Sequence, residues 1–313
     1  MKKLVKKLFA IFSLKVTRVN ELHDFGLYKN RFERIKNSEN LYLKDFDLVI
    51  NPQKHRYVLQ GIRFMNTLRT RYNARFFFDK EDLLIAAING INYNIQTFEE
   101  LFILNEIFNN MVYNFITPKE FAVIDIGMNV GFTSLYLAKN TNCRATYAFE
   151  PFKATFEQAL FNIALNPEFA GKINAFNYGL GNEKRKIEID YDVSIKGNMG
   201  INGIPDYLVG QALQIVKDEI DIRNAAEILQ PIIATIKAQK LDILLKVDCE
   251  GSEYEIFDSL NQSQLLRQFN AIAMEWHVNG PDLLISHLKQ AGYSIFSFNP
   301  ADSGAGMIYA VKQ

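Results

Sequence analysis

The most constraining feature of this sequence is the alternation of short apolar runs with helical patterns from Phe121 to the C-terminus. Near-continuous apolar runs indicate strands buried on both faces, which is typical of a mainly parallel sheet covered by helices. The sequence therefore predicts a doubly wound α/β domain. The runs that predict parallel strands are Phe121–Ile126, Ala145–Phe149, Ile173–Phe176, Asp242–Val247 and Ala271–Met274, and Tyr293–Phe298 and Met307–Val311 predict a closing antiparallel pair.

The first 80 residues differ in charge from the rest of the chain. They contain 18 Lys and Arg against 7 Asp and Glu, whereas the remaining residues contain 17 against 28. We interpret residues 1–80 as a basic, mostly helical N-terminal extension with partners of its own. Basic residues among aromatics also occur in nucleic-acid-binding proteins, but no such motif is present, and we expect no nucleic acid partner.

The N-terminal stretch MKKLVKKLFAIFSLK has apolar residues at helical spacing with lysines around them. This pattern fits either a helix on an anionic membrane surface or a docked terminal helix with solvated lysines. A short apolar core without a small-residue cleavage site argues against a secretory signal. No apolar run approaches the roughly 18 residues of a membrane span, and Cys143 and Cys249 form no zinc or disulfide pattern. We expect a cytoplasmic protein, with peripheral contact at the inner membrane surface as an option.

Two local signals in residues 83–112 predict a hairpin followed by a helix. Asn89-Gly90 lies between two apolar stretches, which is the strongest short-range indication of a two-residue hairpin turn. Thr97-x-x-Glu100 has the spacing of a capping box and predicts a helix that continues to about Asn110.

The first predicted parallel strand ends in a glycine turn. Asp125 closes the strand, and Gly127, Asn129 and Gly131 follow before the next helix. A dinucleotide site normally has Gly-x-Gly-x-x-Gly, whose amides hold a pyrophosphate, and the third glycine is missing here. Glu150, at the end of the second strand, is where a ribose diol is held. Together these residues predict a nucleoside ligand without a pyrophosphate.

Acidic side chains and one histidine follow the later strands. Asp248 and Glu250 stand two residues apart after the fourth strand, and Glu275 and His277 repeat that spacing after the fifth. This grouping favours general acid/base chemistry, with metal ligation as the competing interpretation. No spacing here identifies a metal, and we predict none. The nearby Ser252-x-x-Glu255 predicts a second capping box.

Four motifs, in this order, resemble the FkbM family of S-adenosylmethionine-dependent methyltransferases: VIDIGMNVGFTSLYLA, AFEPFKATFEQALFNIALN, LLKVDCEGSEYEIF and AMEWH. The resemblance begins near Leu83. It divides the chain into the extension (1–80) and a methyltransferase domain (81–313), with the cofactor-binding core at 121–313. Met128 replaces a residue that is usually small in the family, and we expect it to change only packing.

The resemblance implies a Rossmann-like, seven-stranded methyltransferase sheet and S-adenosylmethionine as cofactor. The cofactor contacts that we expect are Asp125, Gly127, Asn129 and Gly131 at the methionine end, Glu150 at the ribose hydroxyls, Asn177 at the adenine edge, and Asp248. The family's usual reaction is O-methylation, often of sugars or secondary metabolites. We therefore expect transfer to a hydroxyl of a saccharide, such as a cell-surface glycan or lipid-linked precursor, with a small secondary metabolite as the alternative acceptor.

A hydroxyl acceptor must lose its proton as the new bond forms, and the catalytic candidates are His277, Asp248 and Glu275. We prefer His277, because an imidazole held by Glu275 or Asp248 would titrate near neutrality. The loop Gly197–Pro205, which follows a predicted strand at Lys186–Asp192, is rich in Gly and Asn and is expected to close over the acceptor.

Two other classes of function remain as alternatives. An NAD-dependent sugar dehydrogenase or epimerase shares the sheet and the ribose acid, but the third glycine and a Tyr-x-x-x-Lys motif are missing. A binding module without turnover would not need the full set of Asp125, Glu150 and Asp248.

Overall fold

The structure is a computed structural model that describes residues 31–115, 117–192, 196, 199–201, 203, 215–299 and 304–313. Its largest element is a seven-stranded sheet of order β15-β16-β14-β13-β7-β8-β9. The strands are β7 (Phe121–Ile126), β8 (Cys143–Phe149), β9 (Ile173–Phe176), β13 (Asp242–Val247), β14 (Ala271–His277), β15 (Tyr293–Phe298) and β16 (Ala305–Lys312). β16 is antiparallel to both of its neighbours, and the other pairings are parallel. The predicted doubly wound sheet is confirmed.

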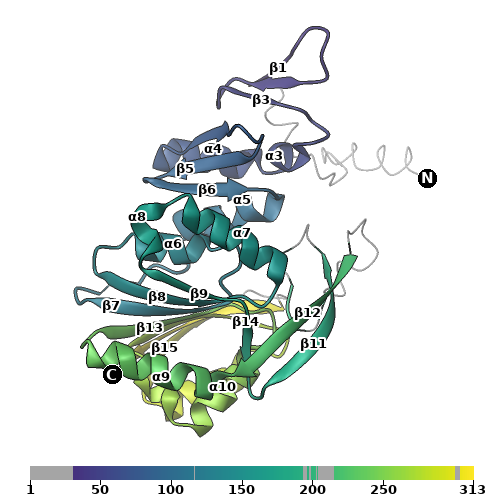
Figure 1. The fold of residues 1–313 in the computed structure, drawn as a ribbon. Coiled ribbons are helices and arrows are strands. Elements are labelled where there is room, and N and C mark those ends of the chain that lie inside the picture. The colour runs from purple at the N-terminus through teal and green to yellow at the C-terminus, as the bar shows by residue number, and fades with distance from the viewer. Residues whose placement is uncertain are drawn as a thin grey trace, which may run out of the picture.

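Helices cover both faces of this sheet (Figure 1). One face carries α6 (Phe132–Ala138), α7 (Lys153–Ala164) and α8 (Pro167–Ala170), and the other carries α9 (Ala225–Ala238), α10 (Glu253–Gln262), η5 (Leu265–Gln268) and α11 (Asp282–Gln290). In α9, Leu229, Ile233 and Ile236 recur at helical spacing and are buried in the main core against the sheet.

The strand order reverses between β7 and β13. From β7 the chain moves to β8 and β9 on one side, and it then returns to β13 and β14 on the other. Because these strands are parallel, their carboxyl ends meet at one edge, with Ile126 opposite Val247. Ligands of doubly wound sheets bind in the crevice beyond such a reversal. The residues that follow β7, β8, β13 and β14 are therefore the first place to look for a site.

The N-terminal part of the described chain is mixed in structure, and the prediction of a mostly helical extension is wrong for residues 31–80. The elements are β1 (Phe32–Arg34), β2 (Leu41–Leu43), β3 (Leu48–Ile50), α3 (Arg56–Gln60), α4 (Ile62–Tyr72) and β4 (Arg75–Phe78). Strands of three or four residues are too short for a period of two to be recognised. β4 pairs with β5 (Leu84–Ile88), so one small sheet crosses residue 80.

The predicted hairpin and capped helix are confirmed. β5 pairs with β6 (Ile91–Ile95), and Asn89 and Gly90 between them have φ of 50° and 79°, as a primed hairpin turn requires. Thr97 and Glu100 form both hydrogen bonds of a capping box at the start of α5 (Phe98–Asn105), which continues into the π-helix η2 (Glu106–Asn110).

The N-terminal elements lie on the side of the sheet covered by α6 and α7 (Figure 1). Phe132 and Leu135 of α6 are buried in the same hydrophobic core as β5, β6 and α5. The N-terminal part therefore packs directly against the helix that begins at the glycine turn.

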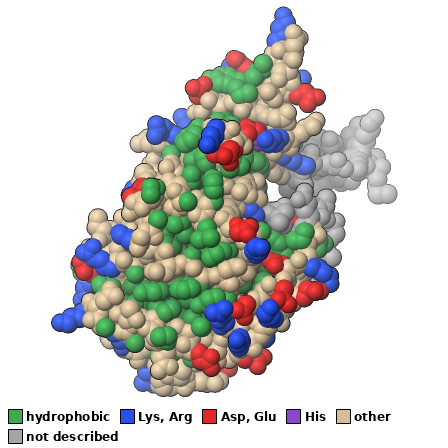
Figure 2. Space-filling model, viewed as in Figure 1, with side chains coloured by type: hydrophobic (Ala, Val, Ile, Leu, Met, Phe, Trp, Pro, Cys, Tyr) green, Lys and Arg blue, Asp and Glu red, His purple; other side chains and the backbone are tan. Residues whose placement is uncertain are grey.

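A second small sheet borders the crevice. It contains β10 (Gly179–Gly181), β11 (Arg185–Asp192) and β12 (Ile215–Asn224), which confirms the strand predicted at Lys186–Asp192. Figure 2 shows basic and acidic side chains gathered over β11 and β12, where Lys186 pairs with Glu219 and Lys217 with Glu188. Most of the loop Gly197–Pro205 lies outside the described residues, as does the N-terminal stretch that suggested a membrane-surface helix. Among the described residues, no helix is both long and apolar enough to cross a membrane.

Candidate active site

The turn after β7 requires its glycines. Gly127 has φ of +81°, and a Cβ there would lie 1.7 Å from the carbonyl oxygen of Asp248. Gly131 has φ of +83° and is the N-cap of α6. Asn129 also has positive φ, and its side-chain oxygen accepts a hydrogen bond from the amide of Val130. The turn after β7 can therefore pack against the backbone after β13 only if it has glycine at Gly127, and its positive φ angles favour glycine and asparagine.

Asp125 is completely buried and is held by two groups within the protein. The hydroxyl of Ser134 donates to its carboxylate at 2.6 Å, and the ammonium of Lys246 lies 3.1 Å away. Lys246 also donates to the carbonyl oxygen of Gly127. Asp125 therefore positions Lys246, which in turn holds the backbone of the glycine turn.

Lys246 was not among the predicted site residues, although a lysine within the apolar run LLKV was a signal that could have found it. It is 2% exposed. Burial alone lowers the pKa of its ammonium, but the negative charges of Asp125 and Asp248 outweigh burial, and the pKa is raised. A permanent positive charge therefore lies beneath the glycine turn.

Glu150 occupies the position expected of a ribose-binding acid. Its carboxylate is buried and accepts hydrogen bonds from the amides of Asn129 and Phe152, at 2.9 and 3.0 Å. Burial raises the pKa of Glu150 to about 7, and these two hydrogen bonds offset part of that effect. The same side chain therefore fixes the glycine turn and presents carboxylate oxygens to the crevice.

A first cavity lies over the carboxyl ends of β7 and β8. Glu150 lines one part of it, and Asp248 and Glu250 line another. Apolar side chains form much of the remaining wall, namely Ile126, Phe149, Phe152, Leu180 and Ile222, and Lys196 lines it as well. Asn177, predicted at the adenine edge, is exposed, donates to the carbonyl oxygens of Glu150 and Pro151, and does not line this cavity.

A second cavity adjoins the first and shares Gly127, Asn129, Asp248 and Glu250 with it. Much of its remaining wall comes from two distant parts of the chain. Segment 99–113, from α5 to Tyr113, contributes Glu99, Phe102, Ile103, Glu106, Ile107 and Tyr113, and the end of β14 contributes Glu275 and His277. The role of segment 99–113 as a wall was missed by sequence reasoning, because no sequence signal places it over the strand ends.

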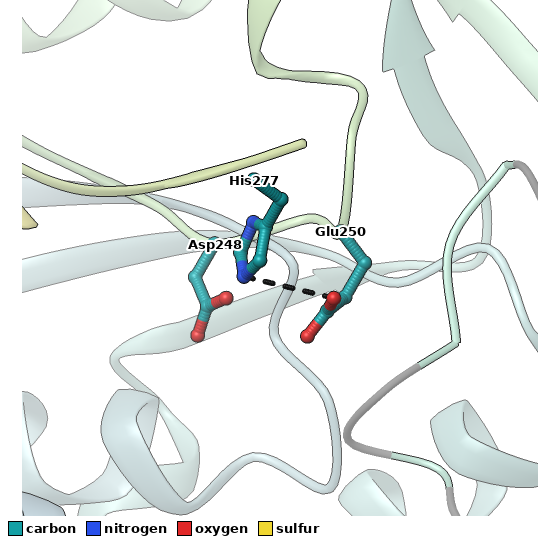
Figure 3. A group of neighbouring side chains, drawn as sticks. All are labelled: Asp248, Glu250 and His277. Carbon is teal, nitrogen blue, oxygen red and sulfur yellow. Dashed lines mark ion pairs between the residues drawn. The ribbon is translucent and has the colours of Figure 1, made fainter. Parts of the chain in front are cut away.

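His277 lies where the sequence placed it, at the end of β14 in the crevice, but the carboxylate that holds its ring most closely is Glu253, and Glu275 is a more distant partner. Its Nδ1 lies 2.8 Å from Oε1 of Glu253, a fully buried side chain that was not predicted. Its Nε2 lies 3.6 Å from Glu250 and 3.8 Å from Glu275 (Figure 3 shows Asp248, Glu250 and His277).

The expectation that His277 titrates near neutrality is wrong. Burial lowers the pKa of His277, but the hydrogen bond with Glu253 and the charge of Glu250 outweigh burial and raise the pKa to about 10. The imidazole is therefore protonated at neutral pH in the free protein, and an imidazolium accepts no proton.

Three carboxyl groups of the second cavity have raised pKa values. Burial raises the pKa of Glu250 to about 8 and that of Glu106 to about 7. Burial and the neighbouring charge of Asp248 raise the pKa of Glu275 in the same direction. Carboxyl groups tuned this way can take up a proton near pH 7, as a general base must.

The capping box predicted at Ser252 and Glu255 does not form. Ser252 makes no side-chain capping hydrogen bond, because its backbone is helical instead of extended. Glu255 instead forms two hydrogen bonds with Arg185, at 2.9 and 2.7 Å. Glu253 takes over the local role, since its carboxylate accepts a hydrogen bond from the amide of Gly251.

The sheet, the glycine turn and the buried acid after β8 define a Rossmann-like protein with a nucleoside-binding crevice. Residues 125–295 match the methyltransferase FkbM domain, and the chain belongs to this family. It is therefore a methyltransferase, and S-adenosylmethionine is its cofactor. The dehydrogenase and epimerase alternative gains no support.

Individual relatives are distant. The chain is 25% identical over 218 residues to "Methyltransferase sdnD" of Sordaria araneosa, covering 63% of this chain and 83% of that protein. It is 25% identical over 243 residues to "AMB antimetabolite synthetase AmbE" of Pseudomonas aeruginosa, covering 66% of this chain and 11% of that protein. The solved methyltransferase FkbM from Methylobacillus flagellatus has a TM-score of 0.43 and 14% identity, covering 99% of this chain and 70% of that one.

The first cavity suits this cofactor. Glu150 can accept hydrogen bonds from a ribose diol, and the apolar walls suit an adenine ring. Asp248 and Glu250, at the boundary with the second cavity, give this end of the site a negative charge that suits a cation.

Proposed function

We propose that this protein transfers the methyl group of S-adenosylmethionine to a hydroxyl of a saccharide. The observation that carries the proposal is the second cavity, which adjoins the first and is lined by the carboxyl groups of Glu106, Asp248, Glu250 and Glu275. Carboxylates accept hydrogen bonds from hydroxyl groups, and a polyhydroxylated acceptor can engage several of them at once.

The bound cofactor supplies an activated methyl group on a positively charged sulfur. The chain's own task is then to hold the acceptor oxygen in line and to remove its proton. We assign proton removal to Glu275, whose raised pKa suits a base near neutral pH. Tyr113, which donates a hydrogen bond to Asp248 at 2.8 Å, fixes that carboxylate at the boundary of the two cavities.

The acidic lining also bears on the charge of the acceptor. The excess of Lys and Arg in the first 80 residues would attract an anionic or lipid-linked acceptor. The second cavity itself, however, is lined by five acidic residues, counting Glu99, against Lys246 and His277. A neutral polyol fits this lining better than a phosphate or a carboxylate does. We therefore favour an acceptor whose reacting end is uncharged.

A small metabolite is the second candidate acceptor. One relative is named as an antimetabolite synthetase, which supports this alternative. The same cavity could also bind a compact molecule with a single hydroxyl group. The saccharide and the small metabolite differ in how many of their hydroxyl groups the carboxyl groups of the cavity would bind.

The test is a methylation assay with matched panels of neutral oligosaccharides, acidic oligosaccharides and small hydroxylated metabolites. Mass spectrometry of the products would locate the added methyl group. Methylation on oxygen of a neutral saccharide is the expected result. Products methylated only on nitrogen or carbon would overturn the proposal, and turnover only with small metabolites would replace the saccharide with the second candidate.

A further inference from the structure

The side chains of Asp248, Glu250 and His277 converge on one point at the boundary of the two cavities. One carboxylate oxygen from each acid and a ring nitrogen of His277 all lie within 4.8 Å of one another. Figure 3 shows the imidazole between the two carboxylates, with all three groups directed into the same space. A divalent ion bound at about 2.0–2.3 Å needs its ligand atoms roughly 3–4 Å apart, so side-chain rotations alone can close the distance.

The histidine is oriented as a metal ligand would be. It is 8% exposed, and its Nδ1 is fixed by the buried Glu253 at 2.8 Å. A carboxylate that holds one ring nitrogen directs the other toward the metal in many metal sites. Here Nε2 has no hydrogen-bond partner among the described residues, only the charges of Glu250 and Glu275 at 3.6 and 3.8 Å.

The carboxylates of Asp248 and Glu250 have oxygens that accept no hydrogen bond from the described residues. In the part of the chain that the structure describes, Asp248 uses Oδ2 for the hydroxyl of Tyr113 and the ion pair with Lys246, and Oδ1 accepts no hydrogen bond. The carboxylate of Glu250 accepts no hydrogen bond from the described residues either, although it faces His277. The side chains of Asp248 and Glu250 are 29% and 22% exposed, so these oxygens face the cavity, where solvent or a cation can satisfy them.

We propose that Asp248, Glu250 and His277 bind a divalent metal ion that coordinates the acceptor hydroxyl, and that the ion displaces the Nε2 proton of His277 to solvent as it binds. One imidazole and two carboxylates suit a first-row ion such as Mn²⁺ or Zn²⁺. This ligand set holds one face of the ion and leaves positions open toward the second cavity. The proposal goes beyond the sequence prediction, which included no metal.

The ion would serve the reaction by lowering the pKa of a bound hydroxyl. The O–H proton then leaves to Glu275, the acceptor oxygen forms a bond to the methyl carbon, and the electron pair of the broken carbon–sulfur bond stays on sulfur. This catalytic part rests on the proposed O-methyl transfer, whereas binding of the ion does not.

Binding of Mn²⁺ alone tests the site without any acceptor. The protein is stripped with a chelator and titrated with Mn²⁺, and the free ion is followed by electron paramagnetic resonance. We expect saturable binding of one ion per chain. Glu250→Gln and His277→Asn remove ligands and should weaken binding at least tenfold. Glu253→Gln keeps the ligands but loosens His277, and should weaken binding by about 10–100-fold.

Glu106→Gln is the matched control, because it makes the same substitution in the same cavity without touching the three ligands. It should bind Mn²⁺ as the wild type does, and thermal melting should show that every variant is folded. No saturable binding by the wild type, or unchanged binding by Glu250→Gln and His277→Asn, would overturn the proposal. Equal weakening by Glu106→Gln and Glu250→Gln would overturn it too, because only diffuse attraction would remain.

Discussion

The buried pair of Asp125 and Lys246 offers the sharpest test of how the glycine turn is held. We consider Lys246→Met, which keeps the apolar stem and removes the ammonium. The ammonium lies 3.1 Å from Asp125, and the two side chains are 0% and 3% exposed. Removal of one member of a buried ion pair leaves an uncompensated charge and costs about 3–5 kcal/mol. Lys246 also donates to the carbonyl oxygen of Gly127, so the turn should loosen.

The free energy of unfolding can be measured with urea, without cofactor, through the fluorescence of the chain's single tryptophan, the buried Trp276. Lys186→Met is the matched control, since Lys186 lies 2.6 Å from Glu219 but is 67% exposed. We expect no measurable loss for the control, because solvent screens such pairs. The double variant Asp125→Asn, Lys246→Met should lose much less unfolding free energy than the sum of the losses in the two single variants. Additive effects, or a loss no larger than in the control, would refute the reasoning.

Three further predictions follow from the site. Gly127→Ala should weaken cofactor binding at least tenfold in a calorimetric titration, because its Cβ would lie 1.7 Å from the carbonyl oxygen of Asp248. Gly171→Ala is the control and should bind the cofactor normally, because a Cβ there would have nothing within 4 Å. Equal effects of the two substitutions would contradict this prediction. Cofactor affinity should rise between about pH 6 and pH 8, because burial raises the pKa of Glu150 to about 7 and a ribose diol donates stronger hydrogen bonds to its charged form. An affinity that is flat or falls with pH would count against that contact. Glu275→Gln should lower the rate constant of methyl transfer by about 10²–10⁴-fold while cofactor affinity changes little, and an undiminished rate would remove Glu275 as the base.

The sheet could be predicted because its strands are continuous apolar runs. Burial on both faces leaves no doubt about a segment such as Phe121–Ile126, whose predicted and observed bounds agree. β10 is three residues long and two of its residues are glycine, and such a segment has no periodicity to detect. The N-terminal strands were not predicted either, because they too are only three or four residues long.

The site could be predicted only where it coincides with strand ends. Gly127, Glu150, Asp248 and His277 lie together because parallel strands present their carboxyl ends at one edge. Lys246 and Glu253 were missed because one lies within a strand and the other in the first turn of a helix.

The partners of His277 determine its charge, and they come from tertiary contacts that spacing does not encode. Glu253 and His277 are 24 residues apart in the chain. The position of the histidine could therefore be predicted, and its protonation state could not.

The most direct test of the account is the affinity of the purified chain for S-adenosylmethionine with Glu150 changed to Gln. Glu150→Gln removes charge-assisted hydrogen bonds worth about 1.5–3 kcal/mol, which corresponds to roughly 10–150-fold weaker binding. Glu157→Gln is the control, since Glu157 is exposed on α7 and outside both cavities. We expect one cofactor to bind per chain, with affinity weakened in Glu150→Gln and unchanged in Glu157→Gln. Equal affinity in the wild type and Glu150→Gln would contradict the central claim that this cavity seats the nucleoside.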